Sequence, residues 1–449
     1  MDIEVIPLGG YNEVGRNMTC VRVGRDAVIF DMGIRLDRIM IHEDKVFEEM
    51  SPDELQQLGA IPNDEPIRAL GLRVKAIVVC HGHLDHMGAL LKLAAPYKAP
   101  IIATPFTIRL LQDQMQSGRG GRGGRIPNQL IAMKAGQSRD LGDGLKIEFL
   151  NITHSIVQSV IGALHTPKGV VVYGNDFKFD NTPVVGQKPD YERLRSLGME
   201  GVNALVVECL GAGEETKTPS EAIARDMLRD YLFGLENERH GILVSTFSSH
   251  TARIKSICEF GVEMDRRVVL LGRSMEKYTH AAIEVGELKL PKEVEIVGGG
   301  RDSEAALKRI VREGKDRFLV VATGHQGEPD ALLSRIANKE TSYPIEKDDH
   351  VIFSAGVIPN PLNVANRYVL ESKLRMQGAR IIKGAHVSGH ASREDHRELL
   401  RMLEPANIYP SHGPIGMQGN YVDLAEAHGW KLNQQIHVSQ NGQTHAVSK

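Results

Sequence analysis

Six consecutive residues, His81-Gly-His-Leu-Asp-His86, place three imidazoles and one carboxylate within a single short segment. An apolar run at 75–80 predicts a buried strand before this segment, and 87–95 predicts a helix after it. Alternate residues of an extended loop point to one side, so the first two histidines face together. The aspartate and the last histidine then lie at the first helical turn. Four ligands are too many for one tetrahedral zinc ion that also holds water, so we predict two metal ions. The alternative, a polar loop with chance histidines, is disfavoured by this spacing.

The composition sets limits on where the protein works and on what it binds. The chain has 449 residues, a net charge of −3 and no run of 18 apolar residues, so we expect no membrane partner. A polyanion would have to be bound locally by metal ions, helix N-termini and a few basic side chains. The four cysteines are far apart in the sequence, which favours reduced thiols over disulfides or a cysteine zinc site. We therefore expect a cytoplasmic protein.

Two patterns of secondary structure divide the chain. Short apolar segments separated by Gly-rich turns begin at Ile3 and predict a β-sandwich. From about Asn203, buried strands alternate with helical patterns such as 220–235, which indicates a parallel sheet. A strand pattern at 379–383 suggests a return to the first domain. We expect an α/β protein in three stretches: the first domain at 1–203, an inserted domain at 204–377, and the rest of the first domain at 378–449.

One low-complexity segment, 117–125, consists of glycine and arginine after Ser117. Its glycine content argues against a packed structure, and Arg119, Arg122 and Arg125 could bind phosphates as a flexible arm. A flexible solvated loop explains the same composition equally well. Both interpretations remain open at this point.

A two-metal site needs three more ligands, and three polar residues follow predicted strands far along the chain. His154 follows a strand at 145–152, Asp176 follows one at 169–173, and His412 comes directly after one that ends at Ser411. Each is weak evidence alone, because a single polar residue at a strand end is more often part of a turn or cap. An aspartate in such a position can bridge two metal ions.

Together with Asp31 in Phe-Asp-Met-Gly, these segments resemble the metallo-β-lactamase superfamily. The resemblance implies an αββα sandwich and two zinc ions, with manganese as a substitute, that activate a water molecule for hydrolysis. It assigns one ion to His81, His83 and His154, and the other to Asp85, His86 and His412. Asp176 would bridge the two ions, and Asp31 would orient a ligand.

The stretch from 204 to 377 resembles the β-CASP insertion of nucleic-acid-processing members of this superfamily. Glu208 in Val-Val-Glu-Cys, His390 in Val-Ser-Gly-His-Ala-Ser and His412 match the three motifs of that insertion. Longer strings resemble the ribonuclease J family in particular, and these are 9–17, 174–180, 272–275, 323–329 and 386–390. The chain departs from the bacterial pattern in the Arg-Gly segment, in His325 where a small residue is usual, and in ending soon after His412. It therefore looks like the shorter archaeal branch.

The resemblance implies a two-zinc ribonuclease that degrades single-stranded RNA 5′ to 3′, prefers 5′-monophosphate ends and can also cut internally. His390, supported by Glu208, would donate a proton to the leaving oxygen, or would only hydrogen-bond the scissile phosphate. Asp85 and Asp176 would act in catalysis as metal ligands. The candidates for binding RNA or its 5′ phosphate are Phe247, Ser248, Ser249, Ser354, His386, Ser388, Gly389 and His390. Most of these fit a helix cap or a turn equally well.

We also expect the protein to form a homodimer. Three other functions are alternatives to the ribonuclease described above. The nearest alternative is a β-CASP endoribonuclease of the mRNA 3′-end cleavage type. A lactamase or glyoxalase would leave the long insertion unexplained. A non-catalytic RNA-binding subunit conflicts with the seven filled ligand positions.

Overall fold

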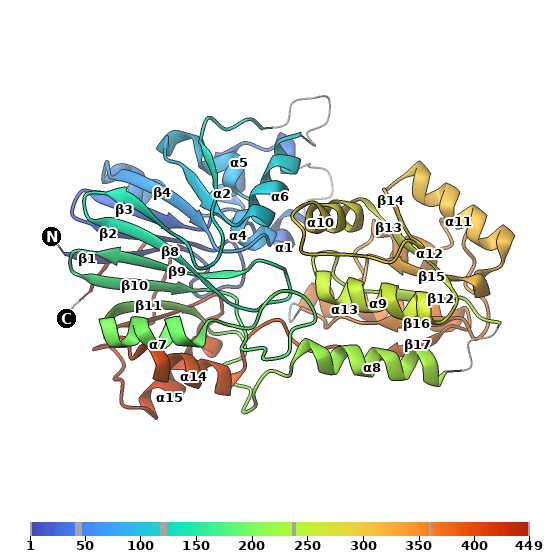
Figure 1. The fold of residues 1–449 in the computed structure, drawn as a ribbon. Helices are drawn as coiled ribbons and strands as arrows, with labels where there is room; N and C mark the ends of the chain where they lie inside the picture. Colours follow the sequence, from blue (N-terminus) through green and yellow to red (C-terminus); the bar gives the residue numbers. More distant parts are fainter. Residues whose placement is uncertain (1, 41–46, 117–123, 236–238, 359–360, 448–449) are drawn as a thin grey trace. The chain divides into compact units, whose positions relative to one another are not determined.

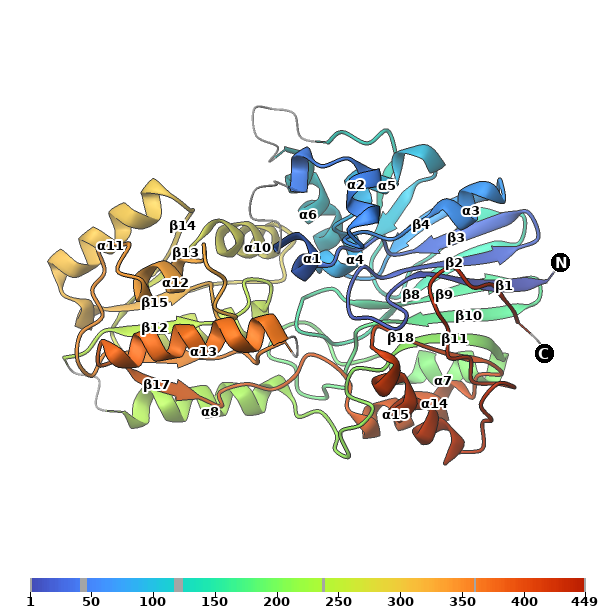
Figure 2. The same cartoon turned by 180° about the vertical axis from the view of Figure 1, so that it is seen from behind.

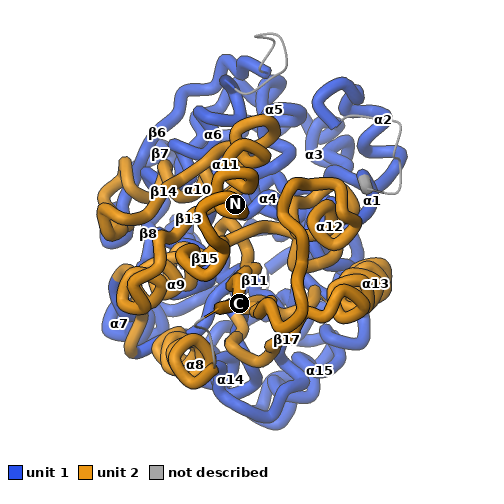
Figure 3. Tube along the Cα trace, turned by 90° about the vertical axis from the view of Figure 1, so that its right-hand side faces the viewer, with its two compact units in different colours: residues 1–181, 187–218, 389–449 blue, residues 182–186, 219–388 orange. Residues whose placement is uncertain are grey.

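The computed structural model describes residues 2–40, 47–116, 124–235, 239–358 and 361–447. Most of the Arg-Gly segment, including Arg119 and Arg122, lies outside these residues; Arg125 is described and exposed. The chain divides into two compact units (Figure 3): unit 1 comprises residues 1–181, 187–218 and 389–449, and unit 2 comprises residues 182–186 and 219–388.

Unit 1 is a sandwich of two sheets with helices on its outer faces (Figure 1). The first sheet has the order β19-β1-β2-β3-β4-β5-β6, with strands β1 (Ile3–Gly9), β2 (Met18–Val23), β3 (Asp26–Phe30), β4 (Arg73–Val79), β5 (Ile101–Ala103), β6 (Leu130–Ala132) and β19 (His445–Ala446). The second has the order β18-β11-β10-β9-β8-β7, with strands β7 (Ser138–Gly142), β8 (Leu145–Asn151), β9 (Val160–Thr166), β10 (Gly169–Gly174), β11 (Val202–Glu208) and β18 (Ile408–Ser411). This architecture is the predicted metallo-β-lactamase sandwich.

Two hydrophobic cores hold the layers of unit 1 together. Phe30, Val78 and Tyr173 belong to the core between the sheets, and Phe30 and Tyr173 stack with ring centroids 4.8 Å apart. Leu205 and Leu399 belong to the core between the second sheet and its helices. The outer helices are α1 (Leu36–Met40), α2 (Pro52–Gln57), α3 (Glu65–Ala69), α4 (Leu84–Met87), α5 (Leu90–Leu93), α6 (Pro105–Gln116), α7 (Tyr191–Glu200), α14 (Arg393–Leu403) and α15 (Ile415–Glu426). Because both sheets are covered on both faces, the strand ends are the positions left for a site.

Unit 2 is a parallel six-stranded sheet with helices on both faces, as predicted for the β-CASP insertion (Figures 1 and 2). Its order is β14-β13-β15-β12-β16-β17, with strands β12 (Ile242–Ser245), β13 (Arg267–Leu271), β14 (Val294–Val297), β15 (Phe318–Ala322), β16 (His350–Phe353) and β17 (Arg380–Lys383). Its helices are α8 (Glu221–Gly234), α9 (Thr251–Glu263), α10 (Arg273–Glu284), α11 (Arg301–Glu313), α12 (Leu332–Ala337) and α13 (Pro361–Met376). Figure 2 shows α13 in front of the sheet face opposite α9.

Two strands lie on the other side of the boundaries expected from the sequence. β11, which falls almost wholly in the predicted insertion at 204–377, pairs with β10 and β18 in the second sheet of unit 1. β17, predicted as the return to the first domain, pairs with β16 in unit 2. The main part of unit 2 therefore begins at Pro219 and ends at Ser388. A short strand with an apolar centre has the same sequence pattern in either sheet, so the sequence could not assign these two.

A helix predicted at 87–95 is divided into α4 and α5. Gly88 and Ala89 separate them, and a side chain at Gly88 would lie 2.5 Å from the carbonyl oxygen of Leu84. Within the described residues, no helix combines the length and the apolar character needed to cross a membrane.

Candidate dinuclear metal centre

The predicted ligands gather because strands that run in the same direction end at one edge of the sandwich. β8, β10, β11 and β18 run the same way in the second sheet, and β3 and β4 run parallel in the first. Each candidate ligand follows one of these strand ends or lies in the loop and helical turn after it. The motif at 81–86 follows β4, and the others are His154 after β8, Asp176 after β10 and His412 after β18.

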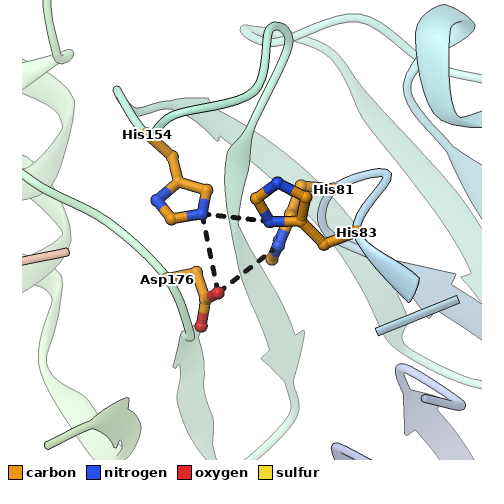
Figure 4. Close-up of side chains that lie close together, drawn as sticks. All are labelled: His81, His83, His154 and Asp176. Atoms are coloured by element: carbon orange, nitrogen blue, oxygen red, sulfur yellow. Dashed lines mark hydrogen bonds and ion pairs between the residues drawn. The ribbon is translucent and has the colours of Figure 1, made fainter. Parts of the chain in front are cut away.

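The first group of ligands consists of His81, His83, His154 and Asp176 (Figure 4). One donor atom from each lies within 4.8 Å of all the others. Asp176 Oδ2 lies 3.5 Å from His81 Nε2 and 3.6 Å from His154 Nε2. His154 Nε2 lies 3.2 Å from His83 Nδ1. The structure therefore brings together the ligands predicted for one ion.

The second group shares Asp176 and adds Asp85, His86 and His412. Asp176 Oδ2 lies 3.2 Å from His86 Nε2, and its Oδ1 lies 3.6 Å from His412 Nε2. Asp85 Oδ2 lies 3.6 Å from each of these two imidazoles. Asp176 Oδ2 thus lies close to members of both groups, and Oδ1 lies close to His412 of the second, so this carboxylate is placed to be shared between two ions.

The spacing of the donor atoms suits binding to a shared metal ion better than it suits hydrogen bonds between the side chains. Two nitrogens bound to one tetrahedral zinc at ~2.0–2.1 Å lie about 3.3 Å apart, close to the separations above. Among the described residues, His81 is fully buried and neither of its ring nitrogens has a hydrogen-bond partner. Asp176 Oδ1 is likewise buried without a hydrogen bond. Buried polar atoms left without hydrogen bonds in this way are expected where side chains bind a metal ion.

Metal binding needs neutral imidazoles and ionised carboxylates, and several of these residues are shifted toward those forms. Burial and the neighbouring His81 lower the pKa of His83 to about 3. Burial and His390 hold the pKa of His154 well below its ordinary value. Burial alone would protonate Asp176, but the imidazoles of His412 and His86 outweigh it and hold its pKa well below the usual range. His86 differs: burial lowers its pKa, but Asp176 and Asp85 outweigh burial and hold the pKa well above its ordinary value.

Hydrogen bonds to Nδ1 leave the Nε2 atoms of His86 and His154 pointing inward. His86 Nδ1 lies 2.7 Å from Asp31 Oδ2, which also accepts from Tyr173. His154 Nδ1 lies 2.7 Å from the carbonyl oxygen of Gly389. Since an ionised carboxylate and a carbonyl only accept, both imidazoles carry their proton on Nδ1. Asp31 therefore orients a ligand, in the position that the resemblance assigned to it.

Three of these residues adopt a left-handed backbone conformation that non-glycine residues rarely use. The φ angles are +59° at Asp31, +58° at Asp176 and +55° at His412. Each directly follows the end of a buried strand or lies two residues after it. Such conformations persist where the surroundings impose them, and they cluster at functional sites. This feature could not be predicted from residue type.

Glu208 and His390 form a pair beside the metal ligands. Glu208 is fully buried at the end of β11, and its Oε2 lies 2.7 Å from His390 Nδ1. Its Oε1 accepts a hydrogen bond from the Phe177 N–H at 2.8 Å. Burial lowers the pKa of His390, but Glu208 and Asp176 outweigh it and raise the pKa to about 9. A protonated imidazole with its Nε2 free of Glu208 is suited to donate a proton.

The candidate RNA-binding residues lie in both units, and the structure corrects one of them. Phe247 and Ser248 are half-buried after β12, whereas Ser249 is buried; His386 and Ser388 are half-buried after β17. Gly389 lies in unit 1 next to His390. Ser354 is fully buried, donates to the carbonyl oxygen of Ala385 and accepts from Arg253. Its hydroxyl is therefore committed inside unit 2, and the prediction that it contacts phosphate is wrong.

Asn17 is a site residue that the sequence reasoning missed. Its Oδ1 lies 2.8 Å from His412 Nδ1, and its amide nitrogen donates to the carbonyl oxygen of Asp85 at 3.1 Å. It therefore holds a ligand from β18 against the motif at 81–86. The signal was available, because Asn17 ends one of the strings matched to the ribonuclease J family, although nothing in the string indicated a partner.

We expect Asn17→Ala to weaken the second group of ligands, because His412 loses the acceptor that fixes its ring. Partners of metal ligands typically contribute 10–100-fold in affinity. The measurement is metal content after dialysis against graded chelator. Asn128→Ala is the control, since Asn128 also donates to backbone carbonyls, those of Ala94 and Ala99, outside the ligand groups. Equal chelator sensitivity in wild type and Asn17→Ala would contradict this role.

Comparison with known proteins identifies the same two parts of the chain. Residues 50–220 match the family described as a beta-lactamase superfamily domain, and residues 239–370 match "Ribonuclease J, beta-CASP domain". Residues 376–433 match "Zn-dependent metallo-hydrolase RNA specificity domain". A solved protein of unknown function from Enterococcus faecalis has the same fold, with a TM-score of 0.65 at 14% identity, over 99% of this chain and 100% of that one.

Similar proteins extend over the full length of the chain. Ribonuclease J of Methanocaldococcus jannaschii is 50% identical over 443 residues, which cover 99% of this chain and 98% of that protein. Ribonuclease J of Pyrococcus abyssi is 48% identical and is covered to 96%, with 98% of this chain matched. The ribonuclease J of Synechocystis is 32% identical over 95% of this chain, which spans 63% of that longer protein.

The fold and the ligand groups define a hydrolase of the metallo-β-lactamase superfamily with an inserted β-CASP domain. With relatives this similar over nearly its whole length, the chain belongs to the ribonuclease J family of nucleases.

Proposed function

We propose that this protein is a two-zinc ribonuclease that degrades single-stranded RNA from the 5′ end, prefers a 5′-monophosphate and also cuts internally. Its role would be RNA decay and maturation. The observation that carries the proposal is the carboxylate of Asp176, which belongs to both groups of candidate ligands, with the Glu208–His390 pair adjoining them. Family membership supplies RNA as the class of substrate.

Each side chain has a defined task in this proposal. His81, His83 and His154 would hold one ion, Asp85, His86 and His412 the other, and Asp176 both. When bound, the ions supply an activated water molecule and a clamp for the scissile phosphate. Manganese is an alternative, since carboxylate and imidazole ligands also suit it.

His390 donates the proton that the leaving oxygen needs. Glu208 keeps its imidazole charged and orients it through Nδ1, which leaves Nε2 as the donor. The buried Glu208 is fixed in turn by the N–H of Phe177, in the loop that follows Asp176. The Glu208 carboxylate therefore holds both the proposed proton donor, His390, and the loop that follows the candidate ligand Asp176.

The preference for a 5′-monophosphate is tested with RNAs that differ only in the group at the 5′ end. Ser388 and Gly389 directly precede His390, so we expect a terminal phosphate to contact the Ser388 side chain and the backbone beside it. Losing one charge-assisted hydrogen bond costs on the order of 1.5–3 kcal/mol, so a 5′-hydroxyl RNA is expected to be cleaved at least about tenfold less efficiently than a 5′-monophosphate RNA. A triphosphate should fit poorly.

The measurement is kcat/KM on one RNA with each of the three 5′ ends. Ser388→Ala should reduce the preference for the monophosphate more than it reduces internal cleavage, which does not need the terminal phosphate. Ser372→Ala is the control, since this half-buried serine on α13 bonds only the Tyr368 carbonyl oxygen among its described contacts. Equal rates on all ends in the wild type would leave the runner-up, a β-CASP endoribonuclease of the mRNA 3′-end cleavage type.

The homodimer and the cytoplasmic location remain predictions. The exposed face of α13 carries apolar side chains, with Val364, Tyr368 and Met376 exposed to 55%, 73% and 87%. An apolar face of this kind favours association with a second copy. All four cysteines are free and buried, which suits a reducing compartment.

A further inference from the structure

Besides Glu208, the side chain of Asp395 is also fully buried. It lies in the first turn of α14. Part of its role is local. Ser392 is the N-cap of α14, and Asp395 accepts a hydrogen bond from the Ser392 N–H at 3.2 Å, which completes a capping box. A capping box needs only this one bond from the carboxylate, so helix capping alone accounts for one of its partners.

Asp395 makes two further bonds to distant parts of unit 1. Its Oδ1 accepts from the Phe179 N–H at 3.2 Å, and its Oδ2 accepts from the Thr218 N–H at 2.8 Å. Phe179 follows Asp176 by three residues, and Thr218 lies in the segment of unit 1 that follows Glu208. One carboxylate thus joins three segments, each of which carries a residue of the proposed site.

The bonds of Asp395 run parallel to those of Glu208. Glu208 bonds the backbone of Phe177 and the ring of His390, and Asp395 bonds the backbone two residues further along each segment, at Phe179 and Ser392. The loop after Asp176 and the loop after His390 are therefore joined twice. Of these two carboxylates, Glu208 is the one that contacts the ring of His390, the proposed proton donor.

Thr218 extends this connection to His390 itself. Its hydroxyl donates to the His390 carbonyl oxygen at 2.7 Å and accepts from the Ser392 N–H at 2.8 Å. Asp395 holds the Thr218 backbone through its N–H. The peptide groups on both sides of Ala391 are fixed in this way.

We propose that Asp395 and Thr218 are positioning residues, which keep His390 in register with Glu208 and Asp176. Neither touches the proposed reacting atoms, so they act through the backbone of His390 and of the loop after Asp176. The inference rests on the proposed function for its kinetic consequence. Its structural consequence, a fixed His390 ring, is independent of any substrate.

The first experiment compares Asp395→Asn with the wild type. The amide cannot accept all three N–H groups, so the loops should shift by a fraction of an ångström, and small misplacement costs up to about 10²-fold in rate. We expect kcat on RNA to fall about 10–100-fold while KM changes less than about twofold and metal content is retained. Glu54→Gln is the matched control, because Glu54 completes a capping box with Ser51 on α2. It should leave kcat unchanged, because no residue of the proposed site is among the described contacts of this cap.

A conservative pair tests Thr218. Thr218→Ser keeps the hydroxyl and should behave as the wild type. Thr218→Val keeps the size, removes the hydroxyl bonds to His390 and Ser392, and should lower kcat as Asp395→Asn does. Nuclear magnetic resonance gives a readout without RNA. The Nδ1–H proton of His390, assigned by its loss in His390→Gln, should be sharp and downfield in the wild type and broadened in Asp395→Asn and Thr218→Val.

The outcomes separate this inference from the proposed function. An unchanged kcat and an unchanged His390 resonance in Asp395→Asn, with a lowered melting temperature, would reduce Asp395 to a helix cap and overturn the inference. Loss of metal from Asp395→Asn would also overturn it, since the residue would then act on the ligands. A wild type that does not cleave RNA would refute the proposed function, while the resonance would still decide the positioning role.

Discussion

Asp176→Asn is expected to abolish RNA hydrolysis while the fold and RNA binding persist. Asp176 is the one residue common to both groups of ligands, with one oxygen 3.2 Å from His86 Nε2 and the other 3.6 Å from His412 Nε2. An amide offers one neutral oxygen where two charged ones are needed. Metal ions contribute several kcal/mol to catalysis, so we expect a loss of at least about 10³-fold in kcat.

Metal content and activity are measured together for this variant. Asp64→Asn is the matched control, because Asp64 is also a buried aspartate of unit 1 but accepts from Tyr97 and Gln56 outside the ligand groups. Its kcat should match the wild type. Full activity of Asp176→Asn after removal of metal by chelator would refute the two-metal assignment.

His390→Gln is expected to lower kcat by about 10²–10⁴-fold, the usual contribution of a positioned proton donor. Metal content should not change, since His390 lies outside the two groups predicted to hold the ions. His165→Gln is the control, because His165 is paired with Glu148 at the same 2.7 Å that separates His390 from Glu208. That variant should retain its kcat.

The leaving group distinguishes the two roles considered for His390. An RNA with sulfur in place of the leaving bridging oxygen releases a thiolate, which needs no proton from the enzyme. If His390 is the proton donor, His390→Gln should cleave this RNA nearly as fast as the wild type does. If the variant loses as much on sulfur as on oxygen, His390 instead binds the scissile phosphate.

The candidate metal ligands could be proposed from the sequence by combining local patterns with a family resemblance. An apolar run followed by a polar residue marks a strand end, and the resemblance to the metallo-β-lactamase superfamily selects His154, Asp176 and His412 among such residues. The residues that orient the ligands depend on contacts between distant segments. Asn17 reaches His412 and Asp395 reaches Phe179 across 395 and 216 residues of chain, and no local pattern encodes such pairs.

Ser354 shows the opposite error, in which a local pattern suggests a function that packing overrules. A serine after a buried strand fits a phosphate site, but the neighbouring Arg253 is fully buried and uses this hydroxyl and the Ser354 carbonyl oxygen as acceptors. Arg253 is paired with Glu221 through two hydrogen bonds. A buried arginine needs partners for its N–H groups, and that need decides the role of Ser354.

The most direct test of the account is elemental analysis of the purified protein combined with an assay on 5′-monophosphate RNA. The two groups of ligands predict two zinc or manganese ions per chain, loss of hydrolysis when both are removed, and recovery when metal is restored. Hydrolysis that continues unchanged in metal-free protein, or a preparation that binds no metal at these residues, would contradict the central claim.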